Sequence, residues 1–271
     1  MAVTDLEDRL AALDAQLLVL DGVLVAFSGG ADSAFLLAAA VRALGPDRVA
    51  AATAVSPSLA ATELPAARAY AEGLGVRHLV PGTDELSREG YTANGADRCF
   101  HCKATLLDTL RPLAASLGLA CVATGTNADD AVAGFRPGMQ AAAERGAVTP
   151  LRDAGLTKAQ VRQASRAWGL VTADKPALAC LASRIAYGVQ VTPARLSRVD
   201  RAETALRAHL GTAEHVRVRD LGEGARVELD PEALARCDER ALDVVRREGF
   251  ADVVAAAFRS GSMNDALRAQ A

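Results

Sequence analysis

The stretch GVLVAFSGGADSAF, residues 22–35, decides the fold because it joins an apolar run to a glycine turn and then to an Ala/Leu-rich segment. The apolar residues 22–27 predict a buried strand, and residues 34–44 predict a helix. Gly29 and Gly30 let the backbone approach a bound group closely and turn its N–H groups toward it. A strand, a glycine turn and a helix in this order predict an anion site at the N-terminus of the helix.

Strands and helices alternate through the first two thirds of the chain. The expected strands are residues 22–27, 48–56, 76–80 and 119–124, and the expected helices are residues 6–20, 34–44, 62–74, 102–117 and 158–168. This alternation predicts an α/β fold with a Rossmann-like, mostly parallel sheet that is covered by helices on both faces. Ligands bind beyond the carboxyl ends of such strands, so the polar turns after residues 27 and 124 should lie side by side.

The pattern changes after Tyr187-Gly188. A helix is expected at residues 193–210, and the alternating runs HVRVRDL (215–221) and ARVELD (225–230) predict a hairpin. Helical segments are expected from Pro231 to the end. We therefore expect two domains, a nucleotide domain at residues 1–185 and a small α+β substrate or oligomerisation domain at residues 186–271.

Composition sets limits on the class of protein. The chain has 271 residues, 51% of them hydrophobic, and a formal net charge of −3 from 30 basic and 33 acidic residues. This balance gives no general attraction to nucleic acid. The acidic, amphipathic residues 1–16 do not resemble a signal peptide, and no apolar stretch is long enough to span a membrane. Five unevenly spaced cysteines do not suggest a disulfide framework, so we expect a cytoplasmic protein with reduced thiols.

The turn FSGGADSAF (27–35) carries the first chemical signal. Ser28 and Ser33 add hydroxyl donors for a phosphate, and Asp32 is suited to hold a Mg²⁺ ion that neutralises a polyphosphate. The Gly-Lys-Ser/Thr ending of the lysine-containing P-loop is absent. The turn resembles the SGGxDS loop of the PP-loop ATP pyrophosphatases, which have an adenine nucleotide alpha hydrolase-like fold. The resemblance implies ATP and Mg²⁺ as cofactors, cleavage between the α and β phosphates, and transfer of AMP to a substrate oxygen.

A second polar turn, GTNADDAVAG (125–134), follows the strand at residues 119–124. Asp129 and Asp130 suit either a helix N-terminus or closure of the nucleotide pocket with a share in Mg²⁺ binding, and we favour the second role for Asp129. Arg136 suits either a phosphate contact or a solvated charge. The predicted nucleotide-binding residues are Ser28, Gly29, Gly30, Asp32, Ser33, Gly125, Thr126 and Asp129, with Asp32 and Asp129 as metal ligands.

The loop DKPALACLASRIAYGVQVT (174–192) contains a single cysteine, Cys180, three residues before Ser183-Arg184. A lone cysteine in an Ala-rich run is usually a small core residue. A guanidinium nearby would instead stabilise a thiolate and an anionic substrate. Composition alone leaves both interpretations open.

This loop resembles the LarE family, and so do DRCFHCK (97–103), residues 125–146 and FRSGSMNDAL (258–267). Members are ATP-dependent sacrificial sulfur transferases that make the nickel-pincer nucleotide cofactor of lactate racemase-type enzymes. The resemblance implies that a carboxylate of pyridinium-3,5-biscarboxylic acid mononucleotide is adenylated and then attacked by Cys180. Cleavage of the Cβ–S bond leaves a thiocarboxylate on the substrate and dehydroalanine in the chain. Cys180 is the only cysteine within residues 177–183, which favours this form over members with an iron–sulfur cluster.

Cys99 and Cys102 form a CxxC pair that suits half a zinc site, a redox pair or a packed helix start. Arg217 and Arg219 alternate with valines, so both should project from one face of a strand, as a phosphate clamp or as a solvated face. Glu203 suits either a base or cation ligand at the site or a surface ion pair, and we favour the ion pair. The predicted substrate contacts are Arg98, Lys103, Arg184, Arg217 and Arg219.

Three other functions remain open at this point. A PP-loop tRNA thiolase is expected to carry a broad basic surface and more cysteines or a zinc module, and the −3 balance counts against it. An ammonia-using amide synthase of the NAD-synthesis type would not need Cys180. A nucleotide-binding protein without chemistry would release no pyrophosphate. We expect a homo-oligomer that acts on a small pyridinium mononucleotide, with no nucleic-acid or membrane partner.

Overall fold

The computed structural model describes residues 2–132, 136–176, 179–211, 213 and 215–264. The chain divides into two compact units, each with its own sheet. Unit 1 takes residues 1–56, 62–85 and 99–178, and unit 2 takes residues 57–61, 86–98 and 179–271. Two short segments of the first half of the chain therefore belong to unit 2, as does Cys180. The domain boundary near residue 186 stays a prediction.

The sheet of unit 1 has four parallel strands in the order β3-β2-β1-β4. The strands are β1 (Val23–Ala26), β2 (Val49–Ala52), β3 (Arg77–Leu79) and β4 (Cys121–Thr124). Because β1 pairs with β4 from Val23↔Cys121 to Ala26↔Thr124, both strands end at the same level of the sheet. The parallel sheet and its four strands confirm the prediction.

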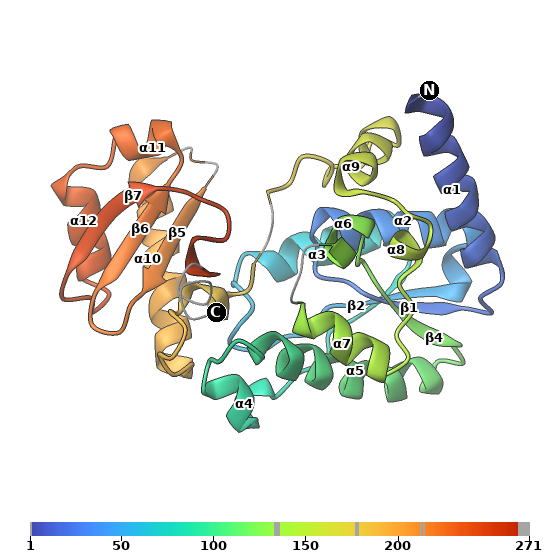
Figure 1. The fold of residues 1–271 in the computed structure, drawn as a ribbon, viewed down its shortest axis with the longest axis horizontal. Helices are drawn as coiled ribbons and strands as arrows, with labels where there is room; N and C mark the ends of the chain where they lie inside the picture. The colour runs from blue at the N-terminus through green and yellow to red at the C-terminus, as the bar shows by residue number, and fades with distance from the viewer. Residues whose placement is uncertain (1, 133–135, 177–178, 212, 214, 265–271) are drawn as a thin grey trace. The chain divides into compact units, whose positions relative to one another are not determined.

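Helices cover both faces of this sheet (Figure 1). Val23 and Val25 of β1 face one apolar cluster and Leu24 faces the other, as the two-residue period of a strand requires. The helices packed in the first cluster are α1 (Ala2–Leu18), α2 (Ala31–Leu44), α3 (Glu63–Gly73), α8 (Pro150–Asp153) and α9 (Lys158–Ala167). Those in the second are α5 (Arg98–Ser116) and α7 (Pro137–Glu144). This arrangement confirms the Rossmann-like α/β class.

The helices α2 and α5 begin earlier than predicted, and this places functional candidates inside them. The first, α2, begins at Ala31 with Gly30 as its N-cap, so Asp32 lies in its first turn. Likewise α5 begins at Arg98, so the CxxC pair lies in its first turns. A further short helix, α6 (Ala128–Val132), begins within the stretch expected to be only a turn.

Unit 2 has a three-stranded sheet in the order β5-β6-β7. The strands β5 (Val216–Asp220) and β6 (Ala225–Leu229) pair antiparallel, which confirms the hairpin. The strand β7 (Val253–Ala257) pairs parallel with β6, so the expectation of helical segments from Pro231 to the end was wrong at these residues. The helices are α4 (Glu89–Thr92), α10 (Pro193–Leu210), α11 (Pro231–Ala235) and α12 (Glu239–Arg246). The helix expected beyond residue 264 lies outside the described residues.

The remaining helical elements of the described residues are short 3-10 helices. They are η1 (Pro46–Arg48), η2 (Glu85–Ser87), η3 (Leu181–Arg184) and η4 (Ser262–Asn264). Over these described ranges, no helix combines the length and the apolar character that crossing a membrane requires.

The turns after β1 and β4 lie side by side, as predicted. A Cβ at Gly125 would lie 2.8 Å from the Ser33 nitrogen and 3.0 Å from the Asp32 carbonyl carbon. The turn after β4 therefore packs directly on the backbone of the first turn of α2. Only glycine allows this approach without displacing one of the two turns.

We expect Gly125→Ala to lower the free energy of unfolding by about 1–3 kcal/mol, because the added methyl group meets backbone that cannot rotate away. Urea unfolding measures this change. Gly73→Ala is the matched control, since nothing lies within 4 Å of its added Cβ and Gly73 ends a helix. Equal stability of the two variants would contradict the close contact.

Candidate functional site

Two serine hydroxyls hold the turn between β1 and α2 in shape. Ser28 Oγ and Ser33 Oγ lie 3.1 Å apart, and the Ser33 hydroxyl donates to the Gly30 carbonyl at 3.1 Å. Gly29 has a φ of 74°, a left-handed conformation that glycine adopts without steric cost. The N-terminus of α2, where backbone N–H groups carry partial positive charge, begins directly after this turn at Ala31. Such an arrangement can hold a phosphate group.

The two carboxylate oxygens of Asp32 have different surroundings. Asp32 Oδ2 pairs with Lys158 Nζ at 2.5 Å. Asp32 Oδ1 is buried and has no hydrogen-bond partner among the described residues. Lys158 is the first residue of α9, and its backbone N–H donates to Asp129 Oδ2 at 2.8 Å. The first turns of α2 and α9 are thus joined by one ion pair. This pair lies next to the turn at residues 28–33, which we call the phosphate turn.

The unpartnered oxygen of Asp32 fits a magnesium ion. A buried oxygen without a donor is costly, and Mg²⁺ prefers carboxylate and other hard oxygen ligands. Within the described ranges, no three or more His, Cys, Asp or Glu side chains gather to form a metal site by themselves. A magnesium ion at Asp32 would therefore take its other ligands from phosphate oxygens and water, as is common at nucleotide sites. The metal roles of Asp32 and Asp129 stay predictions.

A second ammonium group, that of Lys175, contacts the phosphate turn at Gly29. Lys175 Nζ donates to the Gly29 carbonyl at 3.1 Å and pairs with Glu63 Oε2 at 2.9 Å. A Cβ at Gly29 would lie 3.8 Å from this nitrogen, so the lysine packs closely against the turn. Lys158 and Lys175 therefore place two ammonium groups at this turn, each balanced by a carboxylate, Asp32 or Glu63.

The acidic residues after β4 are held by local hydrogen bonds. Asn127 Oδ1 accepts from the N–H groups of Asp129 at 2.9 Å and Asp130 at 3.3 Å, which caps α6. Asp130 pairs with Arg136 at 3.5 Å. These contacts agree with the interpretation of Asp129 and Asp130 as residues of a helix N-terminus. Closure of a nucleotide pocket by Asp129 stays a prediction.

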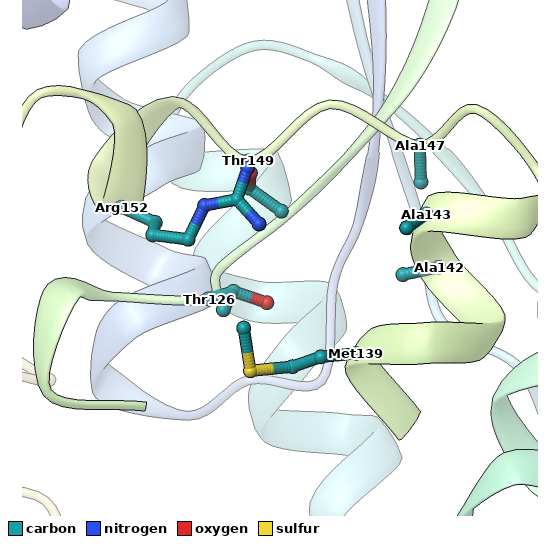
Figure 2. A pocket seen from close by; sticks show the side chains of 7 residues that line it. All are labelled: Thr126, Met139, Ala142, Ala143, Ala147, Thr149 and Arg152. Atoms are coloured by element: carbon teal, nitrogen blue, oxygen red, sulfur yellow. The ribbon is translucent and has the colours of Figure 1, made fainter. Parts of the chain in front are cut away.

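Thr126 lines a small pocket beside the turn after β4 (Figure 2). Its hydroxyl lies 3.2 Å from that of Thr124, and its carbonyl accepts from the Arg152 N–H at 3.0 Å. The pocket is lined by Thr126, Met139, Ala142, Ala143, Ala147, Thr149 and Arg152. Thr126 thus joins the turn to α8 and shares the pocket with residues of α7, and its predicted nucleotide contact stays a prediction.

The CxxC pair lies beside a lysine at the start of α5. Cys99 is exposed and Cys102 is partly buried, and neither forms a disulfide. Burial lowers the pKa of the Lys103 ammonium, while Cys102, Cys99 and Asp130 act in the opposite direction. Lys103 as a substrate contact stays a prediction.

In unit 2, Cys180 is exposed and precedes η3. Its carbonyl accepts from the Ser183 hydroxyl at 2.7 Å and from Arg184 Nη1 at 3.1 Å. The Leu181 N–H donates to the Ser58 carbonyl at 2.9 Å. Side chains and backbone groups therefore hold residues 180–184 in place, while Cys180 stays exposed. The interpretation of Cys180 as a small core residue is excluded by its exposure.

Arg98 supports this loop from the segment at residues 86–98. Its Nη1 donates to the Ala182 carbonyl at 2.9 Å and to Asn94 Oδ1 at 2.5 Å. Asn94 Nδ2 in turn donates to the Ala186 and Val189 carbonyls, both at 2.8 Å. Arg98 is buried, so the contacts shown assign it to loop support. A substrate contact by Arg98 stays a prediction.

Arg184 also holds the cysteine loop. Its Nε and Nη2 donate to Glu203 Oε1 and Oε2 at 2.9 and 3.2 Å, a bidentate pair in which both residues are buried. Glu203 Oε1 also accepts from the Val218 N–H at 3.0 Å, which ties α10 to β5. The expected surface ion pair of Glu203 was therefore wrong as to its location. The reason is that Glu203 lies on the face of α10 that packs against β5.

Arg217 and Arg219 are both buried on β5, so the solvated-face interpretation was wrong. Arg219 Nε and Nη2 donate to Glu228 Oε2 at 3.0 and 2.8 Å, and its Nη1 donates to the Ser183 carbonyl at 3.3 Å. Burial lowers the pKa of Arg217 to about 10, and the neighbouring Arg184 guanidinium adds to this effect. A cluster of buried guanidiniums behind the cysteine loop is suited to an anion.

Sequence reasoning missed several residues of these sites. Lys158 lies outside the quoted motifs, although it follows Thr157, which caps α9 at the same edge of the sheet. Lys175 lies within the quoted loop at residues 174–192, but it was given no role. Asn94 has a φ of 57°, a left-handed conformation, and the Asn-Gly pair that it forms with Gly95 is a turn signal that could have drawn attention to it. Glu228 is the buried partner of Arg219, and the Ser262 hydroxyl from the terminal motif donates to its Oε1 at 2.8 Å. The roles of these residues became visible only through contacts between distant segments.

Comparison with known proteins gives two relatives that are similar along most of the chain. No family model matches the chain. The chain is 47% identical over 215 residues to an uncharacterized protein of Synechocystis sp., covering 79% of each chain. It is 36% identical over 270 residues to the pyridinium-3,5-bisthiocarboxylic acid mononucleotide synthase of Lactiplantibacillus plantarum, covering 97% of this chain and 96% of that protein. With this likeness along nearly the whole of both proteins, the chain belongs to the LarE family of the PP-loop superfamily.

Proposed function

We propose that this protein is an ATP-dependent sulfur transferase that converts a carboxylate of pyridinium-3,5-biscarboxylic acid mononucleotide into a thiocarboxylate. The observation that carries the proposal is the 36% identity, over nearly the whole of both chains, to a synthase named for the bisthiocarboxylic acid product. The proposed reaction requires a site for a polyphosphate and an accessible sulfur atom. The turn between β1 and α2 and the exposed Cys180 supply candidates for both.

Activation of the carboxylate is the first step. A substrate carboxylate oxygen attacks the α-phosphorus of ATP, and the bond to the bridging oxygen breaks as pyrophosphate leaves. The role of the turn at Ser28–Ser33 is to bind and orient the polyphosphate through its N–H and hydroxyl donors. Asp32 would hold a magnesium ion, which neutralises charge on the leaving pyrophosphate. Lys175 adds a fixed positive charge beside Gly29.

Sulfur transfer follows from the acyl adenylate. The Cys180 thiolate attacks the acyl carbon, and AMP leaves with the electron pair of the broken C–O bond. A base then removes the Cα proton of Cys180 while the Cβ–Sγ bond breaks. The sulfur leaves with the substrate as a thiocarboxylate, and residue 180 becomes dehydroalanine. Each protein molecule then donates one sulfur atom, which is the sacrificial form of the reaction.

The buried arginines of unit 2 support an anionic substrate for this reaction. Arg184 and Arg219 hold the backbone of residues 179–183 in place through carbonyl contacts. Arg217 lies in the same cluster of positive charge, where a substrate phosphate would offset the mutual repulsion of the guanidiniums. We assign the substrate phosphate to this cluster.

The role of Asp32 is tested by replacing its carboxylate with an isosteric amide. Asp32→Asn should lower pyrophosphate release from MgATP at least roughly a hundredfold, because an amide cannot neutralise a magnesium ion. Ser87→Ala, in the separate turn η2, serves as the control. Release by Asp32→Asn at the rate of the unchanged protein would remove Asp32 from the site.

The sacrificial step is tested through the intact mass of the protein. Wild type should stop near one turnover and become lighter by the mass of hydrogen sulfide as Cys180 becomes dehydroalanine. Cys180→Ala should bind ATP but form no thiocarboxylate, and Cys180→Ser should trap an ester, because oxygen accepts the acyl group but supplies no sulfur. Cys99→Ala, Cys102→Ala, Cys121→Ala and Cys237→Ala control for the other thiols. Thiocarboxylate formation by Cys180→Ala would overturn the proposal.

The substrate role of the guanidinium cluster is tested at Arg217. Arg217→Gln should weaken binding of the pyridinium mononucleotide by roughly tenfold or more, because a buried charge-assisted contact to phosphate is lost. ATP binding should stay unchanged. Arg226→Gln is the matched control, since Arg226 also lies in the sheet of unit 2 and pairs with Glu228 at 3.0 Å. Calorimetric titration of each variant with each ligand measures this, and equal losses for both ligands would point to a structural role.

A further inference from the structure

The ion pair between Asp32 and Lys158 occupies the carboxylate to which the proposed function assigns a magnesium ion. Lys158 Nζ lies 2.5 Å from Asp32 Oδ2, while Asp32 Oδ1 is buried with no partner among the described residues. The Lys158 side chain is 33% exposed, and its backbone is fixed at the start of α9 by the contact with Asp129. The ammonium group thus sits on a flexible stem whose base is held in place.

An ammonium group and a magnesium ion on one carboxylate repel each other. This repulsion lowers the affinity of Asp32 for a free metal ion as long as the lysine stays in place. A lone carboxylate at a phosphate turn would in turn repel a polyphosphate. The lysine therefore neutralises Asp32 while the site holds no nucleotide. Once a nucleotide arrives with its own metal ion, that ion can neutralise Asp32 instead of the lysine.

We propose that Lys158 is a placeholder for the magnesium ion. Its ammonium holds Asp32 before nucleotide binds and keeps free metal from this carboxylate. With MgATP bound, Asp32 would hold the metal ion, and the released Lys158 ammonium would contact the polyphosphate. Lys158 is thus a positioning residue that sets the order of binding, with the metal arriving on the nucleotide. The inference rests on the proposed function, because it takes ATP as the ligand of this turn.

Lys175 offers a matched comparison within the same turn. Its ammonium is also partly buried, but its partners are Glu63 and the Gly29 carbonyl. Removing Lys175 deletes one positive charge from the phosphate turn and leaves the Asp32–Lys158 pair intact. A change that depends only on net charge would therefore appear in both variants, and a change that depends on releasing Asp32 would appear in one.

The experiment measures Mn²⁺ binding by electron paramagnetic resonance without nucleotide, and binding of a non-hydrolysable ATP analogue with Mg²⁺ by calorimetry. Lys158→Met should bind free Mn²⁺ about tenfold more tightly than wild type, and the analogue about tenfold more weakly, the size of one charge-assisted contact. Lys175→Met should not bind Mn²⁺ more tightly. Lys158→Arg, which keeps the charge, should bind Mn²⁺ as wild type does. Adding Asp32→Asn to Lys158→Met should abolish the gain.

Unchanged or weaker Mn²⁺ binding by Lys158→Met would overturn the placeholder role, and so would an equal gain in Lys175→Met. Tighter Mn²⁺ binding with undiminished affinity for the analogue would overturn the transfer to phosphate. Lys158→Gln, which is polar and uncharged, repeats the test should the methionine variant unfold. The Mn²⁺ titration needs neither ATP nor the pyridinium substrate. A wild type that released no pyrophosphate would therefore contradict the proposed function while leaving the metal result decisive.

Discussion

The close packing of Gly125 against the first turn of α2 is the constraint on which the site of unit 1 depends. Because Ala26 and Thr124 pair in register, β1 and β4 end together and their following turns compete for the same space. A side chain at Gly125 would meet the Ser33 nitrogen at 2.8 Å. Its absence lets the phosphate turn, Asp32 and the start of α9 converge, so a backbone contact positions the charged groups.

In unit 2, buried side chains hold the backbone around an exposed cysteine, Cys180. Buried guanidiniums satisfy loop carbonyls on one side and the carboxylates of Glu203 and Glu228 on the other. Burying such pairs is expensive and adds little net stability. Their value lies in fixed geometry, because a bidentate pair allows one orientation of each side chain.

The strands and most helices were predictable because local patterns express them. Buried parallel strands read as apolar runs, and the alternating residues 215–221 and 225–230 read as a hairpin. The strand β7 was not predictable, since its sequence VVAAA suits a helix equally well. It is a strand because β6 offers it a backbone partner, and pairing outweighs the weak local preference.

The sequence by itself determined the α/β class, the phosphate turn, the family and Cys180 as the cysteine of the most specific motif. Glycines, serines and alternating valines act through neighbours in the chain, so their pattern can be read directly. Only the tertiary structure decided that Arg98 and Arg184 support the loop at residues 179–186, that Glu203 is buried, and that Lys158 pairs with Asp32. The partner of a charged side chain depends on which distant segments fold against it, and no local pattern carries that information.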